Sequence, residues 1–359
     1  MHDFVVVGLG PAGSRFARRA AEAGHDVVGF ERGEIGRPLA CSGHVSDDVW
    51  EFTGEGAREE LLQNRILGAR FHVDGPGSEA YPVYKDEPVS NVIDRVGLDR
   101  HLAALARAAG ATLREGHTVT GVEEDRDRVT VTVSGPDGVE RHEARMVVGA
   151  DGPRSRVRDA LGLADPDEFL HGILAFDPDA DAGDFVDVHL TEPTFFAWRI
   201  PRGDAGVEYG LAAPPGADLT DRFAAFCDAY GATVEHRCSG LIPVGPAETV
   251  TTRRGLLIGD AAAQTKPFTG GGICYGMTAA DHAARVVDPT WPATLDDYEH
   301  AWRAELAREI DLGSVLRRAY SLPEPIQRAG LSATAGEIGV HMDRPTSVLS
   351  REHLRAWLG

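Results

Sequence analysis

Three glycines near the start of the chain have the spacing of a dinucleotide-binding turn. Gly8, Gly10 and Gly13 follow the apolar run at residues 4–7. The first glycine of such a motif allows a tight turn, the second lets the backbone approach a pyrophosphate, and the third lets the next helix meet the strand. The free amide groups at the start of that helix bind anions. The spacing therefore predicts a site for a dinucleotide.

A strand–helix–strand unit must position these glycines. A helix rich in alanine and arginine follows Gly13, and a second strand at residues 26–31 ends at Glu31. Glu31 lies 18 residues after Gly13, where an acidic side chain accepts hydrogen bonds from an adenosine ribose. We assign its neighbour Arg32 to the same site. The strand, helix and acid together favour a dinucleotide site over glycines that only form a turn.

Two later strand-to-helix turns also carry an acidic residue. Asp151 follows a buried strand at residues 145–150, and Ser155 and Arg156 open a helix just after it. Asp260 ends a second apolar strand, and a run of three glycines lies at the start of the next helix, at Gly270, Gly271 and Gly272. The alternative is that both are ordinary turns, but three such turns in this order rarely arise by coincidence.

The three turns together resemble those of the flavin-dependent hydroxylase superfamily, which includes p-hydroxybenzoate hydroxylase and the geranylgeranyl reductases. The resemblance implies FAD as cofactor, with Asp151 in the cofactor-binding set and Asp260 at the ribityl chain or pyrophosphate. It also implies that the glycine run at residues 270–272 lies beside the isoalloxazine. Glycines suit that place because they let N–H groups approach the flavin edge where negative charge builds up on reduction.

The resemblance adds two further contacts to the cofactor. Arg95, which precedes a helical pattern, is expected near the pyrophosphate, where a guanidinium suits a bridging diphosphate. A surface salt bridge is the alternative reading of this arginine. Val119 lies in an alternating hairpin at residues 118–133, and its backbone is expected to meet the adenine.

Two other segments resemble signatures of the geranylgeranyl reductase family, whose members saturate isoprenoid double bonds in archaeal lipids or in chlorophyll and quinone tails. Residues 38–43 resemble the PxxCxG signature, and residues 196–201 resemble YxWxFP. Phe196 stands where tyrosine is usual, and Ile200 where phenylalanine is usual. The missing hydroxyl argues against a proton donor at Phe196 but leaves an aromatic wall for a prenyl chain.

The family context gives candidates for the reaction and for substrate binding. The Cys41 thiol is expected to position or protonate the reacting alkene, with a small packing group as the alternative. His44 is the neighbouring titratable group, with a loop histidine bonded to backbone as the alternative. Substrate-lining positions are expected at Phe196 and Trp198, which share one face of a predicted strand, and at Pro267 and Phe268.

The resemblance implies hydride transfer from FADH2 to one alkene carbon and a proton to the other. No second GxGxxG motif is present, so the electron donor is either a transiently bound NAD(P)H or ferredoxin. Three alternative functions remain: an aromatic hydroxylase, a flavin halogenase, and a non-catalytic flavin- or lipid-binding protein. The halogenase needs a lysine between flavin and substrate, and neither Lys85 nor Lys266, the two lysines of the chain, has the expected setting.

Composition excludes other classes of protein. The 36 basic and 56 acidic side chains give a net charge of −20, which makes nucleic acid an unsuitable partner and is typical of a halophilic surface. An archaeal source is what the family resemblance implies. The cysteines form no CxxC pair, so free thiols and no metal site are expected. No apolar run reaches the roughly 20 residues needed to span a bilayer. We expect a cytoplasmic protein that binds a prenylated lipid, with peripheral contact at the inner face of the membrane left open.

The expected fold class is α/β with an α+β insertion. The chain has 359 residues, enough for about two domains. A Rossmann-like FAD-binding domain is expected in residues 1–65, 93–164 and 251–290, and an inserted antiparallel-sheet substrate domain in residues 66–92 and 165–250. Residues 291–359 are expected to form a helical C-terminal region, in which Pro323 and Pro325 end the main helical run. Its tail, with Leu354, Trp357 and Leu358, is expected to pack, with a membrane-surface foot as the alternative.

Overall fold

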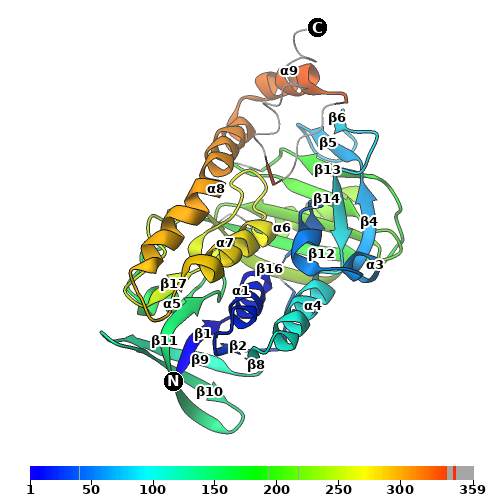
Figure 1. The fold of residues 1–359 in the computed structure, drawn as a ribbon. Coiled ribbons are helices and arrows are strands. Elements are labelled where there is room, and N and C mark those ends of the chain that lie inside the picture. The colour runs from blue at the N-terminus through cyan, green and yellow to red at the C-terminus, as the bar shows by residue number, and fades with distance from the viewer. Residues whose placement is uncertain (40, 193, 217, 338–342, 345–359) are drawn as a thin grey trace.

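The structure is a computed structural model that describes residues 1–39, 41–192, 194–216, 218–337 and 343–344 (Figure 1). The tail residues Leu354, Trp357 and Leu358 lie outside this part of the chain. All four cysteines are free, as expected. Within the described residues, no helix combines the length and the apolar character that a membrane span needs.

The first sheet contains the glycine turn and has the strand order β8-β2-β1-β11-β10-β9, with β17 beside β11. Strand β1 pairs in parallel with β2 and β11, whereas β10 and β9 continue the sheet in antiparallel order. The parallel part is valine-rich because it is buried on both faces. The bounds are β1 His2–Val7, β2 Val27–Phe30, β8 Thr112–Arg114, β9 Thr118–Glu124, β10 Val129–Gly135, β11 Gly138–Gly149 and β17 Gly255–Leu257.

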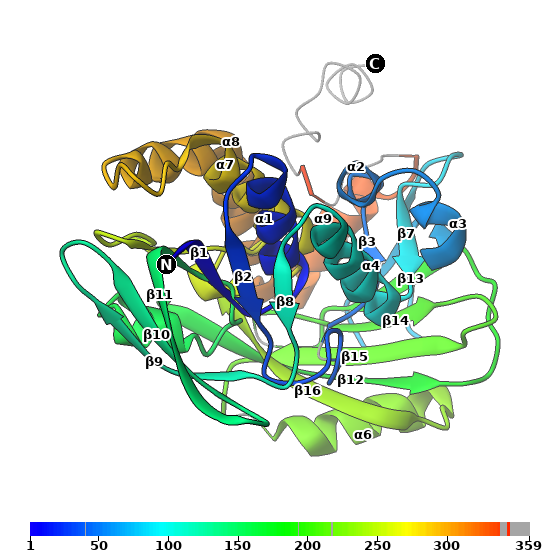
Figure 2. The same cartoon turned by 60° about the horizontal axis from the view of Figure 1, so that its bottom comes forward.

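Helices cover this sheet and bring distant parts of the sequence together. Helix α1 packs against both α4 and α7, and α7 packs against the long helix α8 (Figure 2). The largest side chains of this core, Trp302 and Tyr298, come from α8 and are fully buried. The bounds are α1 Pro11–Glu22, α4 Arg95–Ala108, α5 Arg156–Ala160, α7 Ile273–Val286 and α8 Thr294–Arg318.

The second sheet has the order β16-β12-β15-β14-β13-β5-β6. Its pairs are antiparallel except for β13 and β5, which run parallel, so the expectation of a purely antiparallel sheet was wrong at this pair. Strand β5 comes from an early segment of the chain and lies between β13 and the edge strand β6. The bounds are β5 Gly68–His72, β6 Tyr81–Tyr84, β12 Glu168–Asp177, β13 Phe185–His189, β14 Ala197–Pro201, β15 Val207–Ala213 and β16 Glu235–Val244.

Helix α6 (Leu219–Tyr230) covers one face of the second sheet (Figure 2). Val207, Tyr209 and Leu211 of β15 pack on this helix with Phe223. Because side chains alternate along a strand, the residues between them face the opposite side of the sheet, toward the nucleotide-binding turn.

A small sheet that the sequence did not predict lies beside these two, with β7 between β3 and β4. The expectation that residues 66–92 add strands to the second sheet therefore holds for β5 and β6, whereas β7 joins the small sheet. Two short helices, α2 (Val49–Thr53) and α3 (Ala57–Leu61), pack next to it. The strand bounds are β3 His44–Val45, β4 Leu62–Ile66 and β7 Ser90–Ile93.

The main helical run ends before Pro323, as the prolines predict, but they also open a further helix that was not expected. Helix α9 (Glu324–Thr334) follows Pro323 directly, and Pro325 lies in its first turn. Proline fits there because the first turn of a helix needs no intrahelical N–H donor. The chain then returns to β6, where Gly336 N–H donates to Pro82 C=O at 2.8 Å (Figure 1).

Candidate active site

The glycine turn after β1 has the geometry that its spacing predicts. Gly8 has a φ of 89°, and a Cβ there would lie 2.4 Å from the carbonyl oxygen of Ala150. A Cβ on Gly13 would lie 2.0 Å from Gly8 O, so α1 can pack on the turn only with glycine. By contrast, a Cβ on Gly10 would meet no atom within 4 Å, because Gly10 faces a cavity.

The acidic residue after β2 is tied to this turn. Glu31 accepts a hydrogen bond from the Leu9 N–H at 2.9 Å through Oε2, and from the Arg32 N–H at 3.0 Å through Oε1. Arg32 itself is exposed. Each carboxylate oxygen keeps a lone pair for a further donor, such as a ribose hydroxyl.

Asp151 organises a helix start. It accepts hydrogen bonds from Ser155 Oγ at 2.6 Å and from the Arg156 N–H at 2.7 Å, and burial raises the pKa of its carboxyl. Arg156 donates from Nη1 to the carbonyl of Val119 at 3.0 Å. The DGxxSxxR segment therefore joins the first residue of α5 to β9, with Val119 held at the junction.

Arg95 and Asp260 face one cavity from opposite segments of the chain. Nη1 of Arg95 lies 2.6 Å from Asp99 Oδ1, and its buried Nε has no hydrogen-bond partner among the described residues. Burial raises the pKa of Asp260 to about 6, although Arg95 opposes this shift. A Cβ on Gly272 would lie 2.8 Å from Asp260 Oδ1. A buried donor without a partner and a glycine-lined carboxyl fit the polar middle of a dinucleotide such as FAD.

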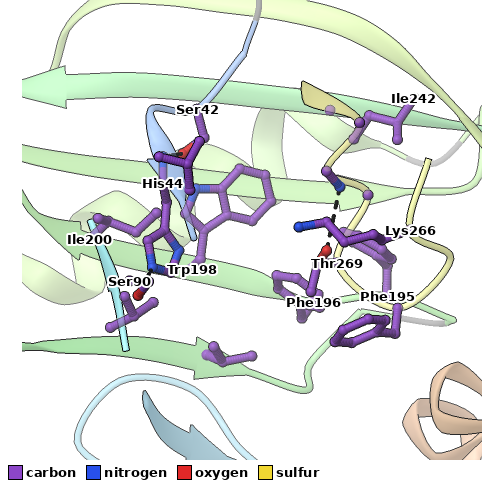
Figure 3. A pocket seen from close by; sticks show the side chains of 18 of the residues that line it. Ser42, His44, Ser90, Phe195, Phe196, Trp198, Ile200, Ile242, Lys266 and Thr269 are labelled. Carbon is purple, nitrogen blue, oxygen red and sulfur yellow. Dashed lines mark hydrogen bonds between the residues drawn. The ribbon is translucent and has the colours of Figure 1, made fainter. Parts of the chain in front are cut away.

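A cavity of about 800 Å³ extends from this polar region into an apolar slot (Figure 3). Phe195 and Phe196 stack there with centroids 4.3 Å apart, and Phe196 meets Trp198 at 5.8 Å and Tyr320 at 5.7 Å. Further along, the slot is lined by aliphatic residues of the second sheet, including Leu174, Val186, Val188, Leu190, Ile200 and Ile242. The expectation that Phe196 and Trp198 share a strand was wrong, since β14 begins at Ala197, but both rings line the slot.

Trp198 is held in place by residues that the sequence analysis missed. Its Nε1–H donates to Glu208 Oε1 at 2.9 Å, and Glu208 in turn accepts from Arg202 Nη1 at 2.8 Å. Trp198 lies directly opposite Gly210 in the β14–β15 pair, and a Cβ there would lie 2.0 Å from the indole. The sequence did contain a signal for this arrangement: Glu208 and Gly210 interrupt the otherwise apolar strand β15 at alternate positions.

Cys41 and His44 both line the cavity. The Cys41 thiol donates to the carbonyl of Ser42 at 3.3 Å, and burial raises the pKa of this thiol, which keeps it protonated at neutral pH. His44 Nε2 lies 2.7 Å from Ser90 Oγ, and burial followed by the Lys266 ammonium lowers the pKa of His44 to about 4. At neutral pH His44 is therefore a neutral imidazole and a poor acid.

The cavity also contains Lys266, which the sequence analysis had set aside. Its side chain is buried and pairs with the Asp343 carboxylate from the C-terminal segment. Its neighbour Phe268 lines the cavity, whereas Pro267 packs on Gly313 of α8. Lys266 is one of only two lysines in the chain, which was the signal that its position is unusual.

The structure thus brings together most, but not all, of the residues singled out from the sequence. Those that line the cavity are Gly10, Cys41, His44, Arg95, Phe196, Trp198, Asp260, Phe268, Gly270, Gly271 and Gly272. Those outside its lining are Gly8, Gly13, Glu31, Arg32, Val119, Asp151 and Pro267.

Comparison with known proteins places this geometry among flavoproteins. The FAD binding domain family matches residues 1–230. Digeranylgeranylglycerophospholipid reductase 2 of Methanopyrus kandleri is 32% identical over 348 residues, covering 89% of this chain and 86% of its own length.

Two solved structures have a similar fold. A geranylgeranyl bacteriochlorophyll reductase-like protein from Thermoplasma acidophilum superposes with a TM-score of 0.86 at 23% identity, covering 99% of this chain and 95% of its own. The p-nitrophenol 4-monooxygenase of Pseudomonas putida gives a TM-score of 0.76 at 20% identity, covering 100% and 96%. At these identities the structural likeness concerns the fold, which a reductase and a monooxygenase share.

Proposed function

This chain belongs to the geranylgeranyl reductase family of FAD-dependent oxidoreductases acting on CH–CH groups, and from this premise we propose that it saturates the isoprenoid double bonds of a geranylgeranyl ether lipid or a related prenyl compound. The observation that carries the proposal is one continuous cavity that joins the nucleotide-binding turn to an apolar, aromatic and aliphatic slot. A hydroxylase of a small phenol has no need of so many aliphatic side chains in its substrate site.

The polar part of the cavity would hold FAD. We assign the pyrophosphate to the N–H groups after Gly10 and to Arg95, whose buried Nε has no partner among the described residues. Asp260 would take the ribityl chain, and the backbone at residues 270–272 would lie against the isoalloxazine. Bound and reduced, FAD supplies a hydride.

The remaining cofactor residues lie toward the adenosine end. Glu31 keeps lone pairs for a ribose hydroxyl, and Arg32 next to it is exposed to an approaching phosphate. Val119 and Asp151 lie where β9 meets α5, and we assign them to the adenine side as the residues that shape it.

The apolar part of the cavity would hold the prenyl chain. An isolated alkene has no carbonyl that a protein could polarise, so catalysis depends on position and on the exclusion of water. The rings of Phe196, Trp198 and Phe268 would clamp the chain. Cys41, whose raised thiol pKa keeps it neutral, would contact the alkene without drawing water into the slot.

We place the mouth of the slot at α9. Leu322 and Ile326 line the cavity and are also 43% and 54% exposed. Apolar side chains that are both exposed and continuous with a lipid-sized slot suit a chain delivered from a membrane surface. Peripheral membrane contact at this end is therefore part of the proposal.

Anaerobic flavin reoxidation tests the proposal. The purified holoprotein is reduced with dithionite, which makes NAD(P)H and ferredoxin unnecessary, and is mixed with geranylgeranyl ether lipid or with its fully saturated analogue. We expect reoxidation only with the unsaturated lipid. Reoxidation by neither lipid, together with oxygen uptake coupled to a phenol, would replace the proposal with the aromatic hydroxylase alternative.

A further inference from the structure

Lys266 places a second buried cation, besides Arg95, in the cavity that joins the polar region to the apolar slot. The Lys266 N–H donates to Gly271 C=O at 2.9 Å and the Gly270 N–H donates to Lys266 C=O at 2.8 Å, so the loop fixes the start of the side chain. A Cβ on Gly271 would lie 2.8 Å from Lys266 Cε. Figure 3 shows the ammonium end pointing into the pocket, on the side of Phe196 and Trp198.

The partner of Lys266 lies between two cavities. Asp343 lines the large cavity and also a second pocket of about 320 Å³. It accepts a hydrogen bond from Ser46 Oγ, and its backbone carbonyl accepts one from Tyr275 Oη at 2.8 Å. The second pocket is polar, with carboxylates at Asp48, Glu51, Asp281, Glu305 and Glu309 and basic groups at His282, Arg285 and Arg344.

This ion pair needs an explanation beyond stability. The exposed fractions of the two side chains are only 6% and 4%. Removing two charges from water costs several kcal/mol, which their attraction offsets only in part, so apolar residues at both positions are often as stable. A chain with so few lysines nevertheless places one of them here.

The reaction has a demand that this pair can meet. Saturation of one double bond needs one hydride and one proton, and a slot that excludes water cannot take the proton from solvent. His44 is neutral at neutral pH, since burial lowers its pKa to about 4. Lys266 lines the cavity, forms an ion pair with Asp343 and is linked through that residue to a polar pocket on the other side.

We propose that Lys266 and Asp343 form a proton relay that links the polar second pocket to the apolar slot. The inference rests on the proposed function. Reduced FAD would supply the hydride, with its electron pair, for one alkene carbon, and an N–H bond of the Lys266 ammonium breaks as a C–H bond forms at the other carbon. The Asp343 carboxylate then takes a proton from water in the second pocket and passes it to the neutral amine, which restores the ammonium–carboxylate pair.

Replacing Lys266 by arginine distinguishes two roles for this side chain: transfer of a proton, or a positive charge that only stabilises the fold. Lys266→Arg keeps the positive charge and the pair with Asp343, but a guanidinium does not release its proton in a protein. The matched control is Lys85→Arg, the same change at the exposed second lysine. For each protein we measure FAD content, the unfolding temperature, and the single-turnover rate of anaerobic flavin reoxidation by the lipid in H2O and D2O.

The relay predicts that Lys266→Arg binds FAD and unfolds like the wild type but reoxidises at least about a hundredfold more slowly. A rate within about twofold of wild type, with an unchanged solvent isotope effect, would overturn the relay. If Lys266→Arg fails to bind FAD, Lys266→Ala with added methylammonium decides: rate recovery that grows with methylammonium supports the relay, and no recovery overturns it. A wild-type protein that no prenyl lipid reoxidises would instead overturn the proposed function, and the relay with it.

A second measurement is independent of turnover. Acetic anhydride labels amines, and Lys85 serves as internal reference for Lys266 in mass spectra of the holoprotein saturated with product lipid. Because Asp343 lies between Lys266 and the second pocket, Asp343→Ala should raise Lys266 labelling relative to Lys85 several-fold, whereas the surface variant Asp26→Asn should not. Equal labelling in wild type and Asp343→Ala would contradict a link between the two cavities.

Discussion

Trp198 donates a hydrogen bond from its indole nitrogen to Glu208 at 2.9 Å, on the face of the second sheet that looks into the slot. Glu208 is fully buried and is neutralised by Arg202. A carboxylate in this position fixes the angle of the indole, and the absence of a side chain at Gly210 leaves room for its ring. The aromatic wall of the slot is thus held by polar groups behind it.

We expect Gly210→Ala to displace this indole. The new Cβ would lie 2.0 Å from Trp198 Cε2, which predicts a loss of about 1–3 kcal/mol of unfolding free energy and a raised KM for the prenyl lipid. Thermal unfolding and steady-state kinetics measure both effects. The control is Gly75→Ala, where a Cβ meets nothing within 4 Å. Adding Trp198→Leu should restore most of the lost stability, and a double variant no more stable than Gly210→Ala would show that the clash is not the cause.

Two alanine substitutions in the glycine turn should separate folding from cofactor binding. Gly10 has a φ of −69° and open space at its Cβ position, so Gly10→Ala should change the unfolding free energy of the apoprotein by less than about 0.5 kcal/mol. It should nevertheless weaken FAD binding at least about tenfold, because the methyl group enters the cavity.

Gly13→Ala should instead destabilise the apoprotein by about 3 kcal/mol or more, because its Cβ would lie 2.0 Å from Gly8 O. Chemical denaturation and FAD titration give the comparison. Equal FAD affinity in Gly10→Ala and wild type would show that the pyrophosphate does not bind at this turn.

Cys41 lines the slot next to the polar region, so we expect Cys41→Ala and Cys41→Ser to keep FAD bound while saturation slows. A tenfold or larger fall in single-turnover rate, at unchanged FAD content, is the predicted result. Cys227→Ala serves as a control for the loss of a buried thiol on α6. If both Cys41 variants turn over like the wild type, the thiol only fills space.

Stability should fall in mild acid because of His189. This side chain is fully buried, bonded to Asp74 C=O at 3.1 Å and to Tyr230 Oη at 2.7 Å, and burial lowers its pKa to about 4. An unfolded histidine titrates near 6.5, so the unfolded chain binds this proton first as the pH falls from about 6.5 to about 4. The contribution is complete above pH 6.5, and about 2 kcal/mol of it should be lost between pH 7 and pH 5.

Urea unfolding of wild type and His189→Asn at pH 7 and pH 5 measures this contribution. The pH-dependent loss of stability should shrink by about 2 kcal/mol in the variant. His236→Asn, at an exposed histidine, is the control. The same pH dependence in His189→Asn and wild type would refute the assignment.

Local sequence was enough to predict the nucleotide-binding half of the site. Gly8, Gly10 and Gly13 act within a single turn, and Ser155 caps its own helix, so neighbouring residues decide their geometry. The aromatic wall around Trp198 depends on the pairing of β14 with β15. The alternating pattern of β15 predicted a strand but not which strand it would pair with.

The Lys266–Asp343 pair could not have been predicted in the same way. The two residues are 77 positions apart, and only the packing of the C-terminal segment brings them together. Likewise, the hydrogen bond between His44 and Ser90 requires β3 and β7 to pair, and no local sequence pattern predicts that pairing.

The most direct test of the account is the mass of the product lipid. Holoprotein reduced anaerobically with dithionite is incubated with geranylgeranyl ether lipid, and the lipid is analysed by mass spectrometry. We predict a rise of about two mass units for each double bond saturated, and the loss of that rise when Gly10→Ala weakens FAD binding. Lipid of unchanged mass, from a protein that holds reducible FAD, would contradict the central claim.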